Sequence, residues 1–201
     1  MVVVKLIMNA SADENYLENT LKYIEYDKDR IGFNKDTCEL VYNIRNDFVC
    51  KHGYGVNYYD YKMAFKQMQQ IKHYFCKRDN VDNYKPMVHL VVSFDKDDDL
   101  DDCKRCCYHL EKWIGDVKGY QNVWGIHRTL YKSRKYGCML ETYHAHFVIN
   151  NTSYMTGNAF ECNRSALCAI INQINLVMGR YCEGWVDNQS THKLIRLCWK
   201  K

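Results

Sequence analysis

The segment from residue 141 to residue 151, ETYHAHFVINN, decides the fold class because it has the pattern of a buried β-strand. Side chains alternate between the two faces of a strand, so His144 and His146 share one face while Phe147 and Ile149 occupy the other. Two imidazoles on one face of an apolar strand each need a polar partner or a bound cation. The segment therefore predicts a buried sheet that carries a metal site.

A third metal ligand is expected from a neighbouring strand. Residues 122–129 have the pattern of a strand that pairs in a hairpin with residues 142–150, and this strand carries His127. Three neutral imidazoles leave coordination positions open for water or substrate. Such a set is typical of a catalytic metal site rather than a closed structural one.

Apolar periodicity elsewhere predicts an α/β (α+β) fold. Ser11 and Glu14 form a capping box, which is expected to begin the first helix. The predicted helices are 11–25, 59–76, 99–114 and 165–181, and the predicted strands are 1–9, 87–94, 122–129 and 142–150. We expect a single, largely antiparallel sheet of about five strands, with the helices packed mainly on one face.

Length and composition favour one domain that spans residues 1–201. The eleven cysteines follow no repeated spacing, which fits reduced thiols in the cytoplasm better than a secreted disulfide framework. The net charge of +4 is a weak argument for an anionic partner, and no segment is apolar over the length of a membrane span. The group Cys103, Cys106 and Cys107 lacks a second cysteine pair at similar spacing, so no zinc site is expected there.

Charge is distributed unevenly along the chain. Acidic residues gather in 95–102, where they are expected to begin a solvated helix. Basic residues alternate with tyrosines after His127, and this group comprises Arg128, Tyr131, Lys132, Arg134, Lys135 and Tyr136. Cations beside aromatic faces suit contact with a single nucleic-acid strand, although a solvated hairpin tip explains the pattern equally well.

Three segments, in order along the chain, resemble motifs of the relaxases, the mobilisation nucleases of conjugative and mobilisable plasmids. The segment Leu21-Lys-Tyr-Ile24 resembles their N-terminal tyrosine motif. The segment His89-Leu-Val-Val-Ser-Phe94 resembles their central motif, and His144-Ala-His146 resembles their histidine motif. The resemblance covers about residues 1–185, which we expect to form the core of a relaxase-like nuclease domain.

The resemblance implies a metal-dependent endonuclease and strand transferase that nicks single-stranded DNA at a plasmid transfer origin. Tyr23 is then the nucleophile that forms a 5′-phosphotyrosyl link, with Tyr26 as the alternative. His127, His144 and His146 are expected to hold the divalent metal, Mn²⁺ or Mg²⁺. Accessory mobilisation proteins are further expected partners.

Other residues are assigned supporting roles. Glu141 stands three positions before His144 and is expected to orient a ligand imidazole or to carry a proton. In relatives the upstream histidine usually lies close before the histidine pair and is often followed by an acidic residue. Here the interval from His127 to His144 is long, and Arg128 follows His127. His89 therefore stays open as an alternative third ligand. The predicted DNA-contacting residues are Ser93, His89, Asn150, Arg128 and Lys132.

Two other functions stay open. A replication initiator of the same His-hydrophobic-His superfamily would use similar chemistry, with a nucleophile after the histidine pair at Tyr154 or Tyr181. A DNA-binding module that has the fold without the catalysis is the second alternative. A covalent protein–DNA adduct distinguishes the nicking enzyme from this module.

Overall fold

The computed structural model describes residues 1–7, 14–25, 28–34, 39–76, 85–132, 137–179 and 182–187. Its strands form one seven-stranded sheet in the order β2-β3-β5-β6-β4-β1-β7. The strands are β1 (Val2–Ile7), β2 (Lys28–Asn34), β3 (Glu39–Tyr54), β4 (Met87–Ser93), β5 (Asn122–Lys132), β6 (Met139–Asn150) and β7 (Cys182–Asp187). Neighbouring strands are antiparallel except for β1 and β7, which run parallel.

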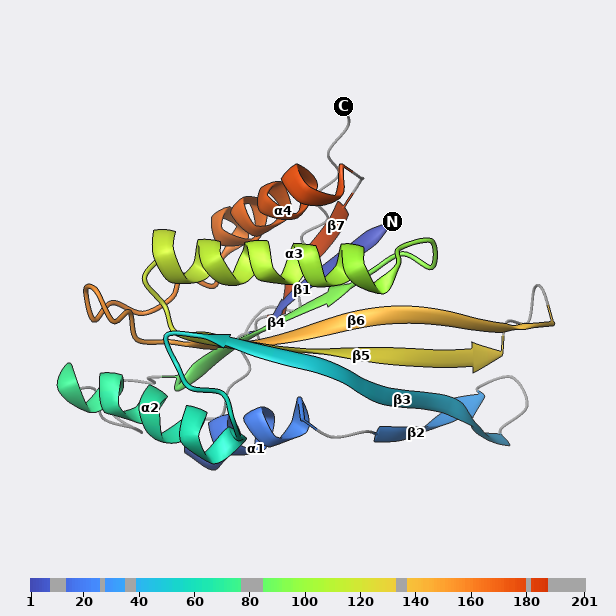
Figure 1. Cartoon of the computed structure of the whole chain (residues 1–201), viewed down its shortest axis with the longest axis horizontal. Helices are drawn as coiled ribbons and strands as arrows, with labels where there is room; N and C mark the ends of the chain where they lie inside the picture. Colours follow the sequence, from blue (N-terminus) through green and yellow to red (C-terminus); the bar gives the residue numbers. More distant parts are fainter. Residues whose placement is uncertain are drawn as a thin grey trace.

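Helices cover both faces of the sheet (Figure 1). The helices α3 (Leu100–Lys112) and α4 (Arg164–Met178) lie on one face, and a short π-helix, η1 (Trp113–Val117), continues α3. The helices α1 (Glu14–Tyr23) and α2 (Tyr61–Tyr74) lie on the opposite face. The predicted α/β class and the largely antiparallel sheet are confirmed. The structure differs from the prediction in having seven strands and in dividing the helices between the faces.

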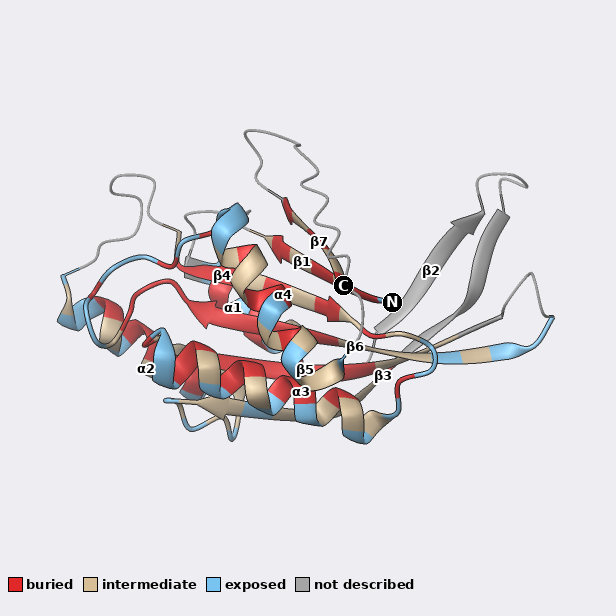
Figure 2. Ribbon diagram, turned by 90° about the horizontal axis from the view of Figure 1, so that it is seen from above, coloured by how far each residue is buried: buried red, intermediate tan, exposed pale blue. Residues whose placement is uncertain are grey.

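The two helical layers have separate cores because both faces of the central strands are apolar. On the α3 and α4 face, Trp124 and Phe147 are fully buried in the larger core. On the other face, Leu17 and Leu21 of α1 pack in a smaller core with Val148 of β6. Figure 2 shows the buried residues concentrated in the central strands and on the inner sides of the helices. Burying each such side chain stabilises the fold by roughly 1.5–3 kcal/mol.

Side chains cap α2, α3 and α4 at their first turns and so fix where each of these helices begins. The Asp60 carboxylate accepts a hydrogen bond from the Met63 amide at the start of α2. The Asp99 carboxylate accepts one from the Asp102 amide at the start of α3, which confirms that the acidic run 95–102 begins a helix. Each cap satisfies an amide group that has no partner within the helix, which contributes about 1 kcal/mol.

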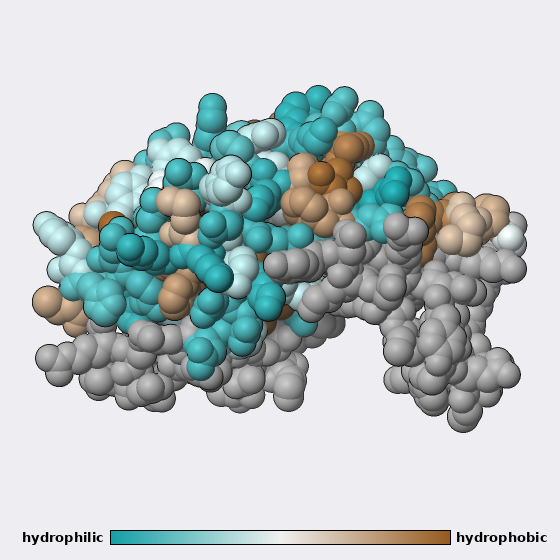
Figure 3. Space-filling model, turned by 60° about the horizontal axis from the view of Figure 1, so that its bottom comes forward, coloured by the Kyte–Doolittle hydropathy of each residue, from teal (hydrophilic) through white to brown (hydrophobic). Residues whose placement is uncertain are grey.

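Among the residues that the structure describes, the surface seen from the side of α1 and α2 is mainly hydrophilic, and apolar residues gather there in separate patches (Figure 3). Within the described ranges, no helix combines the length and the apolar character needed to cross a membrane.

Candidate active site

Three histidines meet on the sheet face that α1 and α2 partly cover. His127 of β5 lies directly opposite His144 of β6, and His146 lies opposite Gly125, so alternation places all three imidazoles on one face. Their ring centroids are 5.0–5.4 Å apart. One ligand atom from each residue lies within 4.8 Å of the other two. The structure therefore brings together the three residues that the sequence predicted as a group.

The donor set fits a divalent metal with open coordination positions. Three imidazole nitrogens bind the later transition metals more tightly than Mn²⁺ and bind Mn²⁺ more tightly than Mg²⁺, and three protein ligands leave room for water or substrate. His127 and His146 are buried, whereas His144 is partly exposed. The partly exposed His144 marks the side from which a ligand can approach the group.

Two of the histidines use their Nδ1 atoms in hydrogen bonds to the protein. Nδ1 of His144 lies 3.1 Å from Oγ1 of Thr129, and Nδ1 of His146 lies 2.9 Å from Nε2 of His89. Contacts of this kind hold a metal-binding imidazole in one orientation and leave Nε2 as its ligand atom. Thr129 was not among the residues predicted for the site. Its position two residues after His127 on the same strand face was the available signal.

Tyr23, the expected nucleophile, ends α1 beside the histidine group. Its ring is nearly perpendicular to the His146 ring at a centroid distance of 5.1 Å, and the His127 ring lies at 6.2 Å. The residue is partly buried, so its side chain is not enclosed beneath the core. The alternative nucleophile, Tyr26, lies outside the described residues.

Gly125 allows the end of α1 to lie directly on the sheet. A Cβ atom at this position would come within 2.8 Å of the carbonyl oxygen of Ile24, the residue after Tyr23. Gly125 also lies across from His146 and two residues before His127 on the same strand face. The missing side chain therefore makes room for the backbone that carries Tyr23.

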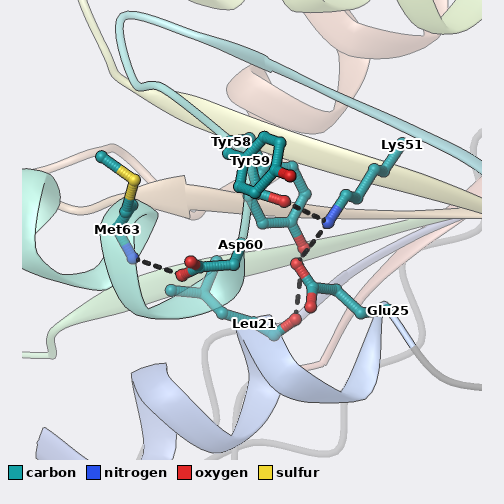
Figure 4. A network of polar contacts seen from close by, with 7 residues as sticks. All are labelled: Leu21, Glu25, Lys51, Tyr58, Tyr59, Asp60 and Met63. Atoms are coloured by element: carbon teal, nitrogen blue, oxygen red, sulfur yellow. Dashed lines mark hydrogen bonds and ion pairs between the residues drawn. The ribbon is translucent and has the colours of Figure 1, made fainter.

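A polar network holds the end of α1 against β3 and the segment before α2 (Figure 4). The Lys51 ammonium donates to Oε1 of Glu25 at 2.7 Å and to the carbonyl of Tyr59 at 3.0 Å. It also lies 4.6 Å from the ring centroid of Tyr58, whose hydroxyl donates to the carbonyl of Leu21. Burial, together with the charge of Glu25, raises the pKa of Tyr58, so this hydroxyl stays protonated as a donor. These contacts flank Tyr23 on both sides along the chain.

Ser93 and His89 of β4 lie on the same face as the three histidines. Ser93 is directly opposite His144, and Val91, two residues away, is opposite His146. Burial, and to a smaller degree the positive charge of Lys5, lowers the pKa of His89 to about 4, so this imidazole is neutral at neutral pH. His89 contacts His146 through a hydrogen bond and is not part of the cluster of three ligand atoms. The third member of that cluster is His127.

The structure does not bring Glu141 or Arg128 to the histidine group. Each is an odd number of residues from a histidine on its own strand, so both side chains point to the opposite face. The Arg128 guanidinium donates to Asp47 at 2.7 Å and lies 3.9 Å from the Glu141 carboxylate. Glu141 also accepts a hydrogen bond from the Tyr143 hydroxyl, which raises the pKa of Tyr143 to about 12. These residues hold neighbouring strands together at the far side of the sheet.

Asn150 and Tyr154 are also separate from the histidine group. The Asn150 amide donates to the carbonyl of Met68 and to Oε1 of Gln121, so this buried residue ties the end of β6 to α2 and to the residue that precedes β5. Lys132 is the last residue of β5, and its side chain is outside the described part of the structure. The Tyr154 hydroxyl donates to the carbonyl of Gly115 in η1, away from the histidines. Tyr181 lies outside the described residues.

Comparison with known protein families identifies the class of protein to which this site belongs. Residues 42–180 match the family described as relaxase, MobA/VirD2-like, nuclease domain. This range covers well over half of the chain, so the chain belongs to the MobA/VirD2-like relaxase family. No curated protein and no solved structure matches the chain. The matched range contains the three histidines and Ser93, whereas Tyr23 lies before it.

Proposed function

We propose that the protein is a metal-dependent endonuclease and strand transferase that nicks single-stranded DNA at a plasmid transfer origin. The observation that carries the proposal is the position of Tyr23, whose ring lies 5.1 Å from that of His146 on the histidine face. Membership of the relaxase family supports DNA as the substrate. Tyr23 lies before the range that matches the family, so its assignment as the nucleophile depends on its position beside the histidines.

In the proposed reaction the phenolic oxygen of Tyr23 attacks the phosphorus of the scissile phosphodiester. A new bond forms between that oxygen and phosphorus, and the bond between phosphorus and the 3′ oxygen breaks. The phenol loses its proton and the departing 3′ oxygen gains one, which gives a free 3′-hydroxyl and a 5′-phosphotyrosyl link. The link preserves a phosphate ester, so a later 3′-hydroxyl can reverse the reaction and reseal the strand.

His127, His144 and His146 are the proposed metal ligands. When bound, the divalent ion supplies positive charge that polarises the phosphate oxygens and stabilises the added negative charge of the transition state. Three imidazoles bind Mn²⁺ and later transition metals more tightly than Mg²⁺, although Mg²⁺ is the more available ion in cells. Neutral ligands also leave the full charge of the ion to act on the phosphate.

Ser93 is the proposed contact for the DNA strand beside the scissile phosphate. It lies across from His144, the most accessible of the three histidines, and its hydroxyl can donate to a phosphate oxygen. Arg128 is a weaker candidate than the sequence suggested, because Asp47 and Glu141 already balance its charge on the opposite face.

The test is a covalent adduct assay with the purified protein. Labelled single strands taken from inverted repeats beside the gene are incubated with Mn²⁺ or Mg²⁺ and separated under denaturing conditions. We expect a denaturant-resistant adduct that Tyr23→Phe abolishes. Tyr16→Phe on the same helix and Tyr26→Phe are the matched controls, and both are expected to retain the adduct.

The same assay separates the alternatives. Loss of the adduct in Tyr26→Phe, with retention in Tyr23→Phe, would reassign the nucleophile. Loss in Tyr154→Phe or Tyr181→Phe would support the replication initiator. DNA binding without an adduct under either metal would support the non-catalytic DNA-binding module.

A further inference from the structure

His89 lies next to the metal site without being one of its three proposed ligands. Its Nε2 atom is 2.9 Å from Nδ1 of His146, and the two ring centroids are 5.1 Å apart. The two rings reach each other from adjacent strands, because Val91 of β4 pairs with His146 of β6 and His89 is two residues from Val91. Direct contact between two imidazoles constrains where each of them carries its proton.

Only one of the two facing nitrogen atoms can carry a proton in this hydrogen bond. If His89 Nε2 were the donor, neutral His146 would carry its own proton on Nε2, the atom needed for the metal. If His146 Nδ1 is the donor, its Nε2 is deprotonated and can bind a cation. The second arrangement requires that His89 accept through Nε2 and carry its own proton on Nδ1.

We propose that His89 is a positioning residue that accepts the Nδ1 proton of His146 and so keeps Nε2 of His146 as a preformed metal ligand. This role rests on the proposed metal-dependent function. In this proposal His89 is neither a metal ligand nor a DNA contact, the two roles that the sequence suggested for it. It orients a ligand imidazole, which is the role that the sequence suggested for Glu141. The partner is neutral, so it orients the ligand without adding a negative charge beside the cation.

Metal affinity tests the role without a catalytic assay. Mn²⁺ is titrated into the metal-free wild-type protein, His89→Gln and His89→Leu, with binding followed by electron paramagnetic resonance. A glutamine places an acceptor oxygen near the position of Nε2, whereas leucine has a similar size and no acceptor. We expect His89→Leu to weaken Mn²⁺ binding about 10-fold to 100-fold and His89→Gln to stay within about threefold of wild type. Thermal unfolding of the metal-free variants checks that each one folds.

The outcomes separate this role from the proposed function. Equal affinities of the wild-type protein and His89→Leu would overturn the role of His89 and leave the metal site in place. An equal loss of Mn²⁺ affinity in folded His89→Leu and His89→Gln would also overturn this role, because a hydrogen-bond acceptor at position 89 would then make no difference. Failure of the wild-type protein to bind Mn²⁺, Mg²⁺ or other divalent ions would overturn the metal-dependent function and this role together.

A second readout needs no metal. Long-range proton–nitrogen correlation spectra of the metal-free protein distinguish an imidazole protonated at Nδ1 from one protonated at Nε2. We expect His146 to carry its proton on Nδ1 in the wild-type protein and in His89→Gln, and to populate both forms in His89→Leu. A wild-type His146 protonated at Nε2 would overturn the proposal.

Discussion

The carbonyl oxygen of Ile24 rests against the bare backbone of Gly125. A side chain on Gly125 would bring its Cβ within 2.8 Å of that oxygen, closer than Cβ atoms approach other atoms in folded proteins. Tyr23 precedes Ile24, and His127 follows Gly125 two residues later on the same strand face. The contact therefore sets the distance between the proposed nucleophile and the proposed metal ligands.

Gly125→Ala is expected to slow adduct formation about 10-fold to 100-fold, because a displacement of about 1 Å of a reacting group can cost that much. The added methyl group pushes the end of α1 off the sheet and moves Tyr23. The rate is measured with saturating oligonucleotide and metal. Gly184→Ala is the matched control, since its Cβ would meet the Val4 carbonyl at 2.9 Å in another part of the sheet. Gly125→Ala and Gly184→Ala should both lower the free energy of unfolding. An equal slowing of adduct formation in the two variants would contradict the prediction.

Lys51→Met is expected to lower the free energy of unfolding by about 1–3 kcal/mol and to reduce adduct formation. The methionine keeps most of the apolar stem, whereas the loss of the ammonium deprives the largely buried Glu25 carboxylate of its cation. Chemical denaturation measures the first effect and the adduct assay the second. The double variant Lys51→Met with Glu25→Gln should recover part of the stability. Strictly additive losses would show that the two residues do not stabilise each other.

The elements with strong apolar periodicity were predictable from the sequence. The strand that carries His144 and His146 ends at Asn150, as predicted, and α4 begins at Arg164, one residue before the prediction. The histidine group was also predictable, because it needs only strand alternation and one hairpin. These inferences depend on local spacing alone.

The features that were missed depend on pairing between distant segments. The strands β2, β3 and β7 lie at or next to the edges of the sheet, where polar residues interrupt the apolar alternation and backbone pairing defines the strand. The contact between His89 and His146 depends on the register of β4 against β6. Glu141 differs from these, because its odd spacing from His144 already indicated the opposite face.

Thr129→Val is expected to weaken Mn²⁺ binding about 10-fold, because valine has the shape of threonine without the oxygen that contacts Nδ1 of His144. Calorimetric titration of the metal-free protein measures the change. Thr142→Val is the matched control, since Thr142 pairs directly with Thr129 on the neighbouring strand. An equal loss of affinity in the two variants would assign the effect to strand pairing rather than to the orientation of His144.

The buried thiol of Cys106 predicts a loss of stability in alkaline solution. Burial raises its pKa from 9.0 to about 12, so the folded protein keeps the proton that the unfolded chain releases above about pH 9. The stabilising contribution is complete below pH 9 and is lost between about pH 9 and 12, at up to about 1.4 kcal/mol per pH unit. Urea unfolding under reducing conditions at pH 8 and pH 10 measures it. Cys106→Ala should show a shallower decline between these pH values, because it has no thiol to ionise, and an unchanged decline would contradict the assignment to this residue.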